Sequence, residues 1–391
     1  MSKNFGVTQK DIAEALNVSR VCVAIALNPK SKSREKLRPD TIARIEAKAR
    51  ELNYRPQRLA RVLRSGRSHT IGVVCQTGIY HAPQERVRHL ARGAIRAGYQ
   101  LVSLDMDWFE RDIDAAQEYL LGVAVEGIVF CNISNQDQLG WQKFIEERSL
   151  PVISINSGPD AVDQARADMY SAFRDMTLHH LEQGSRQVHL LLPFHWKSPG
   201  KDVPPLTPNQ AARLKGYADA IRSVGGEVVA DPIYRQYIGR ATASGPRSAI
   251  RGEVHHPLRT ELCEDVVDLG YYETKRLLQA PRNVPDSIIC SNDHIAAGAL
   301  AACGELGIPV PETVRISGAD NAPVSRYRGV QLTTIEQPAQ RMAQWSIERM
   351  VDLIENPGKR RSPKVEFFPC NLIFRSSTMP DPFTPPSQPP L

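Results

Sequence analysis

The spacing of hydrophobic and polar positions changes near residue 70 and divides the chain into two parts. In the first part, apolar residues recur every three or four positions, which predicts short helices over residues 9–16, 20–27 and 39–52. The hydroxyls of Thr8 and Ser19 precede the first two helices and are suited to cap them. We therefore expect a small all-α unit over residues 1–54.

Beyond residue 70, short apolar runs alternate with amphipathic stretches of helical period. Strands are predicted over residues 71–75, 101–104, 127–131, 152–155, 188–192, 228–229, 287–290 and 314–317. Helices are predicted over residues 84–97, 112–121, 135–148, 166–183, 208–224, 293–305 and 338–355. Repeated strand–helix units predict an α/β body of parallel sheets with helices on both faces. The length of the body favours two doubly wound subdomains.

Two segments show neither period. Residues 235–262 are rich in Arg, Gly, Ser and His, and we expect a long surface insertion there. Residues 379–391 are rich in proline, which predicts a disordered tail.

The composition is ordinary for a soluble globular protein, with 41% hydrophobic and 24% charged residues. The longest apolar run, residues 295–303, is about half the ~18 residues that a membrane helix needs. The N-terminus lacks the apolar core of a signal peptide, so we expect a cytoplasmic protein with no membrane partner. The 7 cysteines are scattered without a Cys-x-x-Cys pair, which predicts reduced thiols and neither disulfides nor a structural zinc ion.

Charge is unevenly distributed along the chain. Residues 1–70 hold sixteen basic and six acidic residues, a net charge of +10, whereas the whole chain carries only +6. Five of the arginines recur at every third position between Arg55 and Arg67, among apolar residues. A basic module on a nearly neutral body suggests a nucleic-acid contact and a separate second function. Charge alone is equally compatible with a solvated basic face.

Two helices joined by a short turn, followed by a third, form the layout of a helix-turn-helix domain, whose second helix enters the DNA major groove. Here the sequence resembles the lactose-repressor (LacI/GalR) family of transcriptional regulators. The resemblance spans residues 7–378 and is carried by these ordered motifs: VTQKDIA (7–13), VS (18–19), LN (27–28), ELNYRP (51–56), RLA (58–60), IGVV (71–74), SNDHIAAGA (291–299), IPVPE (308–312) and LTTIEQP (332–338).

The resemblance implies a domain organisation. Residues 1–54 would form a helix-turn-helix domain that binds operator DNA, and residues 55–69 a hinge and linker whose helix, about 57–64, enters the minor groove. Residues 70–378 would form a periplasmic-binding-protein-like body that binds a small effector between two subdomains and forms a homodimer. The expected subdomains are residues 70–166 with 320–336, and residues 167–319 with 337–378.

The resemblance also implies particular DNA contacts. Arg20 and Val21 occupy positions that read bases, and Arg20 could donate a guanidinium fork to guanine, or contact a phosphate instead. The positions that usually hold phosphates are those of Thr8, Ser19, Asn28, Thr41 and Tyr54. In the hinge, Arg58, Ala60 and Leu63 are the expected contacts, with Leu63 as a wedge between base steps.

Some features of this region remain open or depart from the family. Leu59 and Leu63 could instead pack against the body. Ala24 and Ile25 replace a polar residue and an arginine that the family usually has, so we expect an operator that differs from the usual consensus. Residues 33–36 are the expected insertion before the third helix.

In the body, the resemblance implies effector contacts by Arg213, Asp293 and, at the end of a strand, Asn156. A guanidinium and a carboxylate across a cleft suit the hydroxyls of a sugar or a similar polar ligand. Arg213 and Asp293 could instead form a structural ion pair, or Asp293 could cap its helix.

Enzymatic interpretations find little support. The sequence has no Gly-x-Gly-x-x-Gly after a strand, no P-loop and no Gly-x-Ser-x-Gly. The pairs His179-His180 and His255-His256 lack partners at zinc spacing, so we expect surface residues. We expect no catalytic residues, metal or cofactor. The alternative function is a solute-binding or sugar-modifying βα protein with an accessory basic domain. We favour a dimeric, effector-controlled regulator, with repression favoured over activation.

Overall fold

A computed structural model describes most of the chain: residues 7–28, 31, 33–54, 67–77, 81–106, 112–133, 138–158, 161–192, 206–230, 232–238, 249–255, 265–327, 331–358 and 362–379. They form two compact units, Met1–Ser68 and His69–Leu391. Among the described residues, no helix combines the length and hydropathy needed to cross a membrane. The hinge helix expected at residues 57–64 and nearly all of the tail expected at residues 379–391 lie outside the described residues.

The N-terminal unit contains the three expected helices, α1 (Gln9–Leu16), α2 (Arg20–Ala26) and α3 (Pro39–Glu51). A short 3₁₀ turn, η1 (Arg34–Lys36), lies in the segment expected as an insertion. One apolar residue or more from each α-helix enters the shared core, which contains Ile12, Ala13, Val23, Ala26, Ile45 and Ala49. This small core positions the helices without using their charged residues, which remain at the surface.

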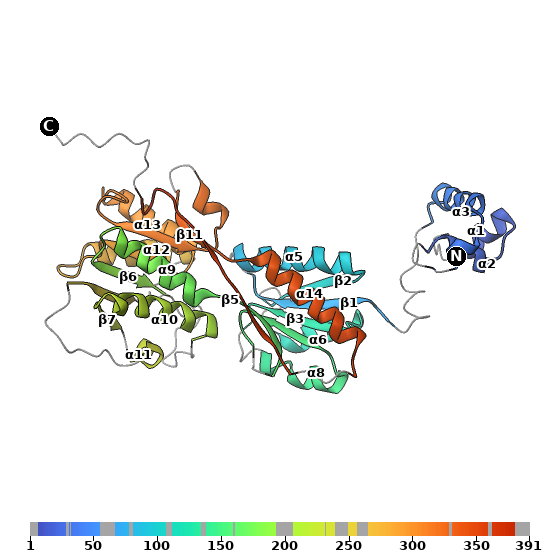
Figure 1. The fold of residues 1–391 in the computed structure, drawn as a ribbon, viewed down its shortest axis with the longest axis horizontal. Helices are drawn as coiled ribbons and strands as arrows, with labels where there is room; N and C mark the ends of the chain where they lie inside the picture. Colours follow the sequence, from blue (N-terminus) through green and yellow to red (C-terminus); the bar gives the residue numbers. More distant parts are fainter. Residues whose placement is uncertain are drawn as a thin grey trace. The chain divides into compact units, whose positions relative to one another are not determined.

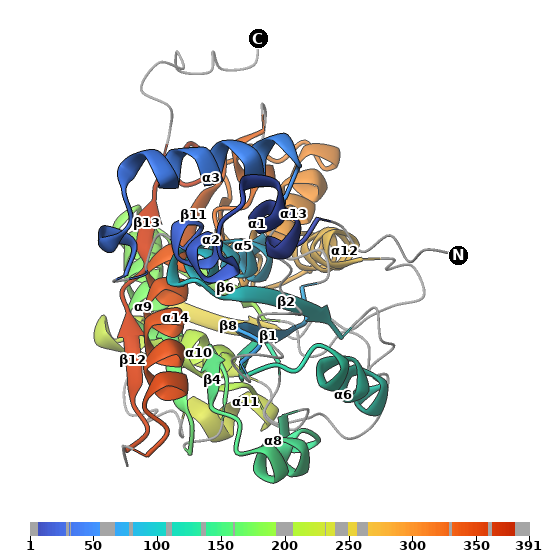
Figure 2. The same ribbon diagram turned by 90° about the vertical axis from the view of Figure 1, so that its right-hand side faces the viewer.

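The first sheet of the body has the strand order β12-β5-β4-β3-β1-β2 and is parallel throughout. Its strands are β1 (Thr70–Cys75), β2 (Gln100–Asp105), β3 (Gly127–Cys131), β4 (Val152–Ile155), β5 (Asp163–Ala167) and β12 (Val365–Phe368). Helices α5 (His81–Ala97) and α14 (Ala339–Glu355) cover one face, and α6 (Ile113–Gly122) and α8 (Gln142–Arg148) cover the other. Figure 2 shows α14 and α6 on opposite sides of this sheet.

The second sheet has the order β13-β11-β10-β9-β6-β8-β7, and only its edge strand β13 runs antiparallel to its neighbour. Its strands are β6 (Gln187–Leu191), β7 (Glu227–Ala230), β8 (Arg251–His255), β9 (Ser287–Cys290), β10 (Arg315–Ala319), β11 (Thr333–Glu336) and β13 (Asn371–Ile373). Helices α9 (Met169–Glu182) and α10 (Pro208–Ser223) cover one face, and α12 (Val266–Leu278) and α13 (Asp293–Glu305) the other. The short helices α11 (Pro232–Ile238) and η2 (Pro323–Arg326) complete this subdomain (Figure 1).

The expected α/β class with two doubly wound parallel sheets is confirmed, but the return segments were assigned to the wrong subdomains. The sequence analysis placed residues 320–336 in the first subdomain and residues 337–378 in the second. In the structure β11 pairs with β10 in the second sheet, whereas α14 and β12 belong to the first. The reason is that α14 packs its apolar stripe beside α5, which a strand-by-strand pattern does not reveal.

The prediction that residues 235–262 form only a surface insertion is also wrong. Arg251–His255 is strand β8, which lies between β6 and β7 inside the second sheet. The residues on one face of this strand are polar. On the other face, Gly252 has no side chain, and Tyr217 packs in the space that a side chain would take. The strand therefore has almost no hydrophobic pattern.

The expected surface position of the first histidine pair is wrong as well. His179 and His180 are both buried in α9. The Nε2 atom of His180 lies 2.8 Å from the Ser317 hydroxyl, and its Nδ1 contacts Ser287. Burial lowers the pKa of His180 to about 3, so this imidazole is neutral and serves as a polar link between helix and sheet.

Two glycines set the distance between α12 and α13. A Cβ atom at Gly298 would overlap the backbone carbonyl oxygen of Val267, and one at Gly270 would overlap that of Ile295. The helices therefore approach as closely as their backbones allow. Gly304, in the same helix α13, has open space where a Cβ would lie.

We expect Gly298→Ala to lower the free energy of unfolding by about 1–3 kcal/mol, because the added methyl forces the two helices apart. Gly304→Ala is the matched control and should be neutral or stabilise the protein by up to about 1 kcal/mol, since alanine is the better helix former. Urea unfolding of the full chain measures both. Equal stability of the two variants would contradict the close approach.

Candidate functional site

The DNA contacts predicted in the first helices lie at helix N-termini. The hydroxyl of Thr8 caps α1 by accepting from the backbone N–H of Asp11, and the Asp11 carboxylate accepts in return from the Thr8 N–H at 2.6 Å. The hydroxyl of Ser19 caps α2 by accepting from the Cys22 N–H at 3.0 Å. Both caps are exposed, so these helix ends present polar groups to solvent.

The side chains at the N-terminal end of α2 are exposed to solvent, whereas the side of the helix that carries Val23 packs into the core of the unit. Arg20 and Val21 are exposed, Val21 to 67%, while Val23 is fully buried. Arg20 makes no ion pair with the described residues, although Lys10, Arg34 and Lys48 of this unit each pair with a glutamate. An exposed arginine and an exposed methyl-bearing side chain at the start of the second helix match what a major groove requires.

The remaining predicted DNA contacts have mixed surroundings. Asn28 is exposed after α2, whereas Thr41 and Tyr54 are half-buried, Tyr54 beside the helical core. Ala24 and Ile25, at the positions that depart from the family, are half-buried. Arg58, Ala60 and Leu63 lie outside the described residues.

In the body, the candidate effector residue Asn156 lies beside two segments through which the chain passes from one sheet to the other. Asn156 follows β4 with a left-handed φ of 65° and is buried. Its Oδ1 accepts from the backbone N–H of Ala167 at 2.9 Å, and its Nδ2 donates to the Gln337 side chain at 3.3 Å. Asn156 therefore holds the last residue of β5 and the segment that follows β11.

Arg213 lies in α10 and faces the carboxyl end of β9. Its Nε donates to Asn209 at 2.8 Å, Nη1 donates to the carbonyl of Ser291, and the guanidinium lies 5.3 Å from the centre of the Phe173 ring. Burial lowers the pKa of Arg213, and the nearby Asp320 carboxylate opposes this shift. The guanidinium remains charged at neutral pH and is placed at the strand ends where ligands of open α/β sheets bind.

Asp293 is fully buried at the start of α13. Its two carboxylate oxygens accept from the Thr334 hydroxyl at 2.6 Å and from the Ala322 backbone N–H at 2.7 Å. Burial raises the pKa of this carboxyl well above its usual range, and these two donors partly offset the shift. The helix cap is Asn292, whose Oδ1 accepts from Ile295 at 2.9 Å, so the capping interpretation of Asp293 is wrong.

Sequence reasoning missed Arg86, which is almost fully buried in α5. Its Nη2 donates to the Gln337 Oε1 at 2.7 Å, and the Gln337 amide donates to Asp320 at 2.6 Å. The Nε and Nη1 atoms are buried and make no hydrogen bond with the described residues. A signal was present, because Arg86 lies on the same stripe of α5 as Leu90 and should otherwise be apolar.

Four of these side chains, Arg86, Asn156, Asp320 and Gln337, are joined by hydrogen bonds between the subdomains. Arg213 and Asp293 interact electrostatically with Asp320, and we call the six residues together the cleft cluster. It brings together all three effector residues predicted from the sequence and adds Arg86, Asp320 and Gln337. Two buried nitrogens of Arg86 make no hydrogen bond with the described residues, so the cluster has unused donors. Such a site favours a ligand rich in oxygen acceptors.

Comparison with known proteins supports the fold independently of the contacts described above. The sequence profile of the "Periplasmic binding protein-like domain" matches residues 177–378. The chain is 26% identical over 382 residues to the HTH-type transcriptional repressor PurR of Glaesserella parasuis, covering 95% of this chain and 98% of that protein. It is 27% identical over 385 residues to PurR of Shigella dysenteriae, covering 96% and 98%.

Among solved structures, the Lac repressor dimer bound to operator and the anti-inducer ONPF matches with a TM-score of 0.69, 21% identity and coverage of 95% of this chain and 99% of that chain. The complex of the transcriptional regulator CelR with cellobiose matches with a TM-score of 0.61, 20% identity and coverage of 95% and 99%. These structures support the fold. The family profile spans about half of the chain and the PurR relatives align over nearly its full length. The chain belongs to the family of the periplasmic binding protein-like domain, and the relatives that it matches over nearly its full length are transcriptional repressors.

Proposed function

We propose that this protein is a repressor that binds operator DNA as a homodimer, and that a small effector between its subdomains controls the binding. The observation that carries this function is that Arg20 and Val21 are exposed at the N-terminal end of α2. The segment that contains this helix, residues 1–70, has a net charge of +10. The protein would act on DNA in the cytoplasm and need no catalytic residues. The PurR relatives are named as repressors, which favours this function over a solute-binding or sugar-modifying protein.

The N-terminal unit would supply both affinity and specificity. Thr8, Ser19, Asn28, Thr41 and Tyr54 are proposed phosphate contacts, and Arg20 and Val21 proposed base contacts. Phosphate contacts release counterions and dominate affinity, whereas base-edge contacts determine the preferred sequence. In the linker, Arg58, Ala60 and Leu63 are proposed minor-groove contacts.

The effector would bind at the cleft cluster. Arg213 is the proposed direct contact, because it is charged and held by a backbone carbonyl at the carboxyl end of β9. Asn156 and Asp293 are proposed contacts that would exchange one of their present hydrogen bonds for a bond to the ligand. The donor-rich cluster favours a sugar or another polar ligand with several oxygen acceptors.

Control of DNA binding would follow from differential affinity. The chain passes between the subdomains next to the cleft cluster, and the Arg86–Gln337–Asp320 bonds span both sides. A ligand that binds one arrangement of the subdomains more tightly shifts the population toward it. In a dimer, that shift changes the separation of the two linkers and therefore the affinity for DNA.

Operator affinity is expected to fall steeply with salt, with about −0.9 in the log–log slope for each phosphate contact. Arg20→Ala should weaken binding to a selected operator about 5- to 150-fold and relax specificity at one base pair if Arg20 reads guanine. Filter binding at several salt concentrations measures both. Arg282→Ala, an exposed arginine of the body, is the control with the same charge change. A salt-independent affinity would contradict binding by the basic unit.

For the hinge, we expect Leu63→Ala to weaken specific binding and reduce DNA bending while leaving thermal stability and non-specific binding unchanged. A helix of about eight residues is unstable alone, so we expect the hinge helix predicted at residues 57–64 to form on DNA. Bending a 20–30 bp site costs roughly 1–6 kcal/mol, which the leucine wedge would offset. Circular-permutation gel shifts measure the bend, with Val62→Ala as the neighbouring control. A bend equal to the parent's would place Leu63 against the body instead.

A thermal-shift screen of sugars and nucleobases would identify an effector, because a ligand that binds the folded state stabilises it. Arg213→Ala should then reduce effector affinity about 10- to 150-fold, since it removes a charged hydrogen-bond donor, and leave operator binding intact. Lys215→Ala, an exposed cation of the same helix, is the control. An unchanged effector response in the folded Arg213→Ala protein would remove Arg213 from the site.

A further inference from the structure

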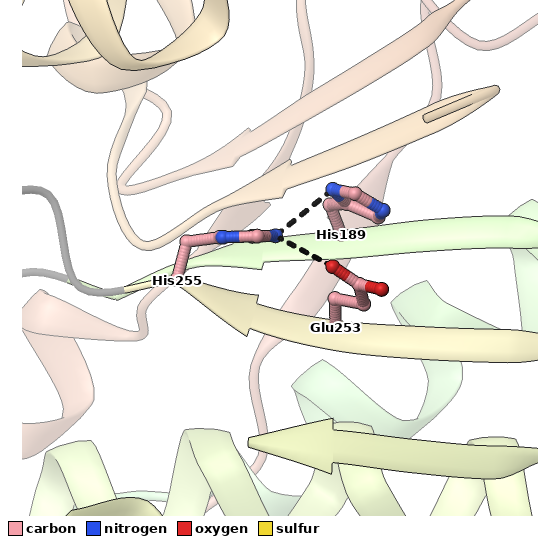
Figure 3. Close-up of side chains that lie close together, drawn as sticks. All are labelled: His189, Glu253 and His255. Atoms are coloured by element: carbon pink, nitrogen blue, oxygen red, sulfur yellow. Dashed lines mark hydrogen bonds and ion pairs between the residues drawn. The ribbon is translucent and has the colours of Figure 1, made fainter. Parts of the chain in front are cut away.

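Three side chains that can bind metal converge on one face of the second sheet. His189 in β6 and Glu253 in β8 are register partners, and His255 lies two residues after Glu253 on the same strand. Because alternate residues of a strand share a face, all three point the same way, toward α12. Figure 3 shows the ring of His255 pointing toward His189 and Glu253, which lie on neighbouring strands.

The atoms that could bind a cation are close together. The Nε2 of His255 lies 2.9 Å from the Nδ1 of His189 and 3.7 Å from the Oε2 of Glu253. One ligand atom from each residue lies within 4.8 Å of the other two. Metal–ligand bonds of about 2.0–2.2 Å at tetrahedral angles would separate neighbouring ligand atoms by roughly 3.3–3.6 Å. The observed separations bracket this range, so small side-chain rotations would suffice.

The surroundings keep the three side chains in place. His189 is only 1% exposed, and the side chains of Glu253 and His255 are largely buried. The second ring nitrogen of His255 lies 3.9 Å from the carboxylate of Glu273 in α12, which in turn binds Arg276 at 2.5 Å. Arg251 holds the other oxygen of Glu253 at 2.7 Å. A carboxylate behind a ligating histidine is the usual outer shell of a metal site.

Both histidines are suited to act as ligands at neutral pH. Burial lowers the pKa of His189 to about 3 and also lowers the pKa of His255. Neutral imidazoles retain a lone pair for a metal and form no ion pair with Glu253. The three converging atoms are therefore two imidazole nitrogens and one carboxylate oxygen.

We propose that His189, Glu253 and His255 form a binding site for a divalent first-row transition-metal ion such as Zn²⁺. Two imidazoles and one carboxylate are ligands that such ions accept, with water in the remaining positions. Mg²⁺ and Ca²⁺ prefer oxygen ligands and do not fit this set. The residues differ from those proposed for DNA and effector, so the site goes beyond the proposed function and can be tested without either ligand.

His255 and His256 have no ligand partner at short spacing, which predicted that the chain binds no metal. The partner of His255 is His189, 66 positions away, brought to it by the pairing of β6 with β8. Since the segment containing β8 was expected to be a surface insertion, this pairing was not foreseen.

The test uses the full chain without a histidine tag, stripped of metal and titrated with Zn²⁺ by calorimetry. We expect one Zn²⁺ per chain and a rise in melting temperature, because the ion would join β6 to β8. Glu253→Gln and His255→Gln should each lower Zn²⁺ affinity at least about tenfold. His89→Gln removes a histidine that lies 3.7 Å from Glu85 in α5, and is the control that should leave Zn²⁺ binding unchanged.

Circular dichroism of each variant without metal separates loss of a ligand from loss of fold. Co²⁺ titration of the unmodified protein gives a readout that needs no variant, since nitrogen ligands produce a d–d spectrum distinct from that of the hydrated ion. Absence of Zn²⁺ binding, a Co²⁺ spectrum like that of the hydrated ion, or equal Zn²⁺ affinity in folded Glu253→Gln and His255→Gln proteins would overturn the proposal. The cluster would then be a polar network between the sheet and α12.

Discussion

Three very short segments connect the two sheets of the body, and the buried side-chain hydrogen bonds between the subdomains are made beside them. The chain passes from β5 to α9, from β11 to α14 and from β12 to β13, with one or two residues between the elements each time. Side-chain hydrogen bonds hold the first two of these connecting segments. Asn156 accepts from Ala167 at the first, and Arg86, Asn156 and Asp320 bind Gln337 at the second. Since Asn156 takes part in both, the two passages are linked.

This arrangement would couple the proposed ligand binding to movement of the subdomains. Buried polar groups are stable only while their hydrogen bonds are satisfied, so the cleft cluster favours discrete arrangements over continuous deformation. Asp293 shows the constraint clearly. Its buried carboxyl group depends on donors from β11 and from the loop after β10, and moving either would leave a buried oxygen without its hydrogen-bond donor. A ligand that replaces one of these donors can therefore favour one arrangement.

The N-terminal unit meets a different constraint. Its core consists of a few aliphatic residues, among them Ile12, Val23 and Ile45, while the chain around it carries a large excess of positive charge. Self-repulsion of that charge opposes compactness, and neutralisation by phosphates would relieve it. Keeping the basic residues in a separate unit leaves the body nearly neutral, so its fold does not depend on bound DNA.

The sequence by itself determined the helices of the N-terminal unit, the α/β class and most strands of the two sheets, because these follow from local hydrophobic period and capping. Through family resemblance it also indicated Arg213 and Asn156 as candidate effector contacts, which stay a prediction. Only the tertiary structure decided what local patterns do not encode. It placed β11 with β10 and α14 with α5, inserted the polar strand β8 into the second sheet, and brought Arg86 to Gln337. It also joined His189 to His255. Each of these depends on contacts between segments distant in sequence, where burial and strand pairing outweigh local propensity.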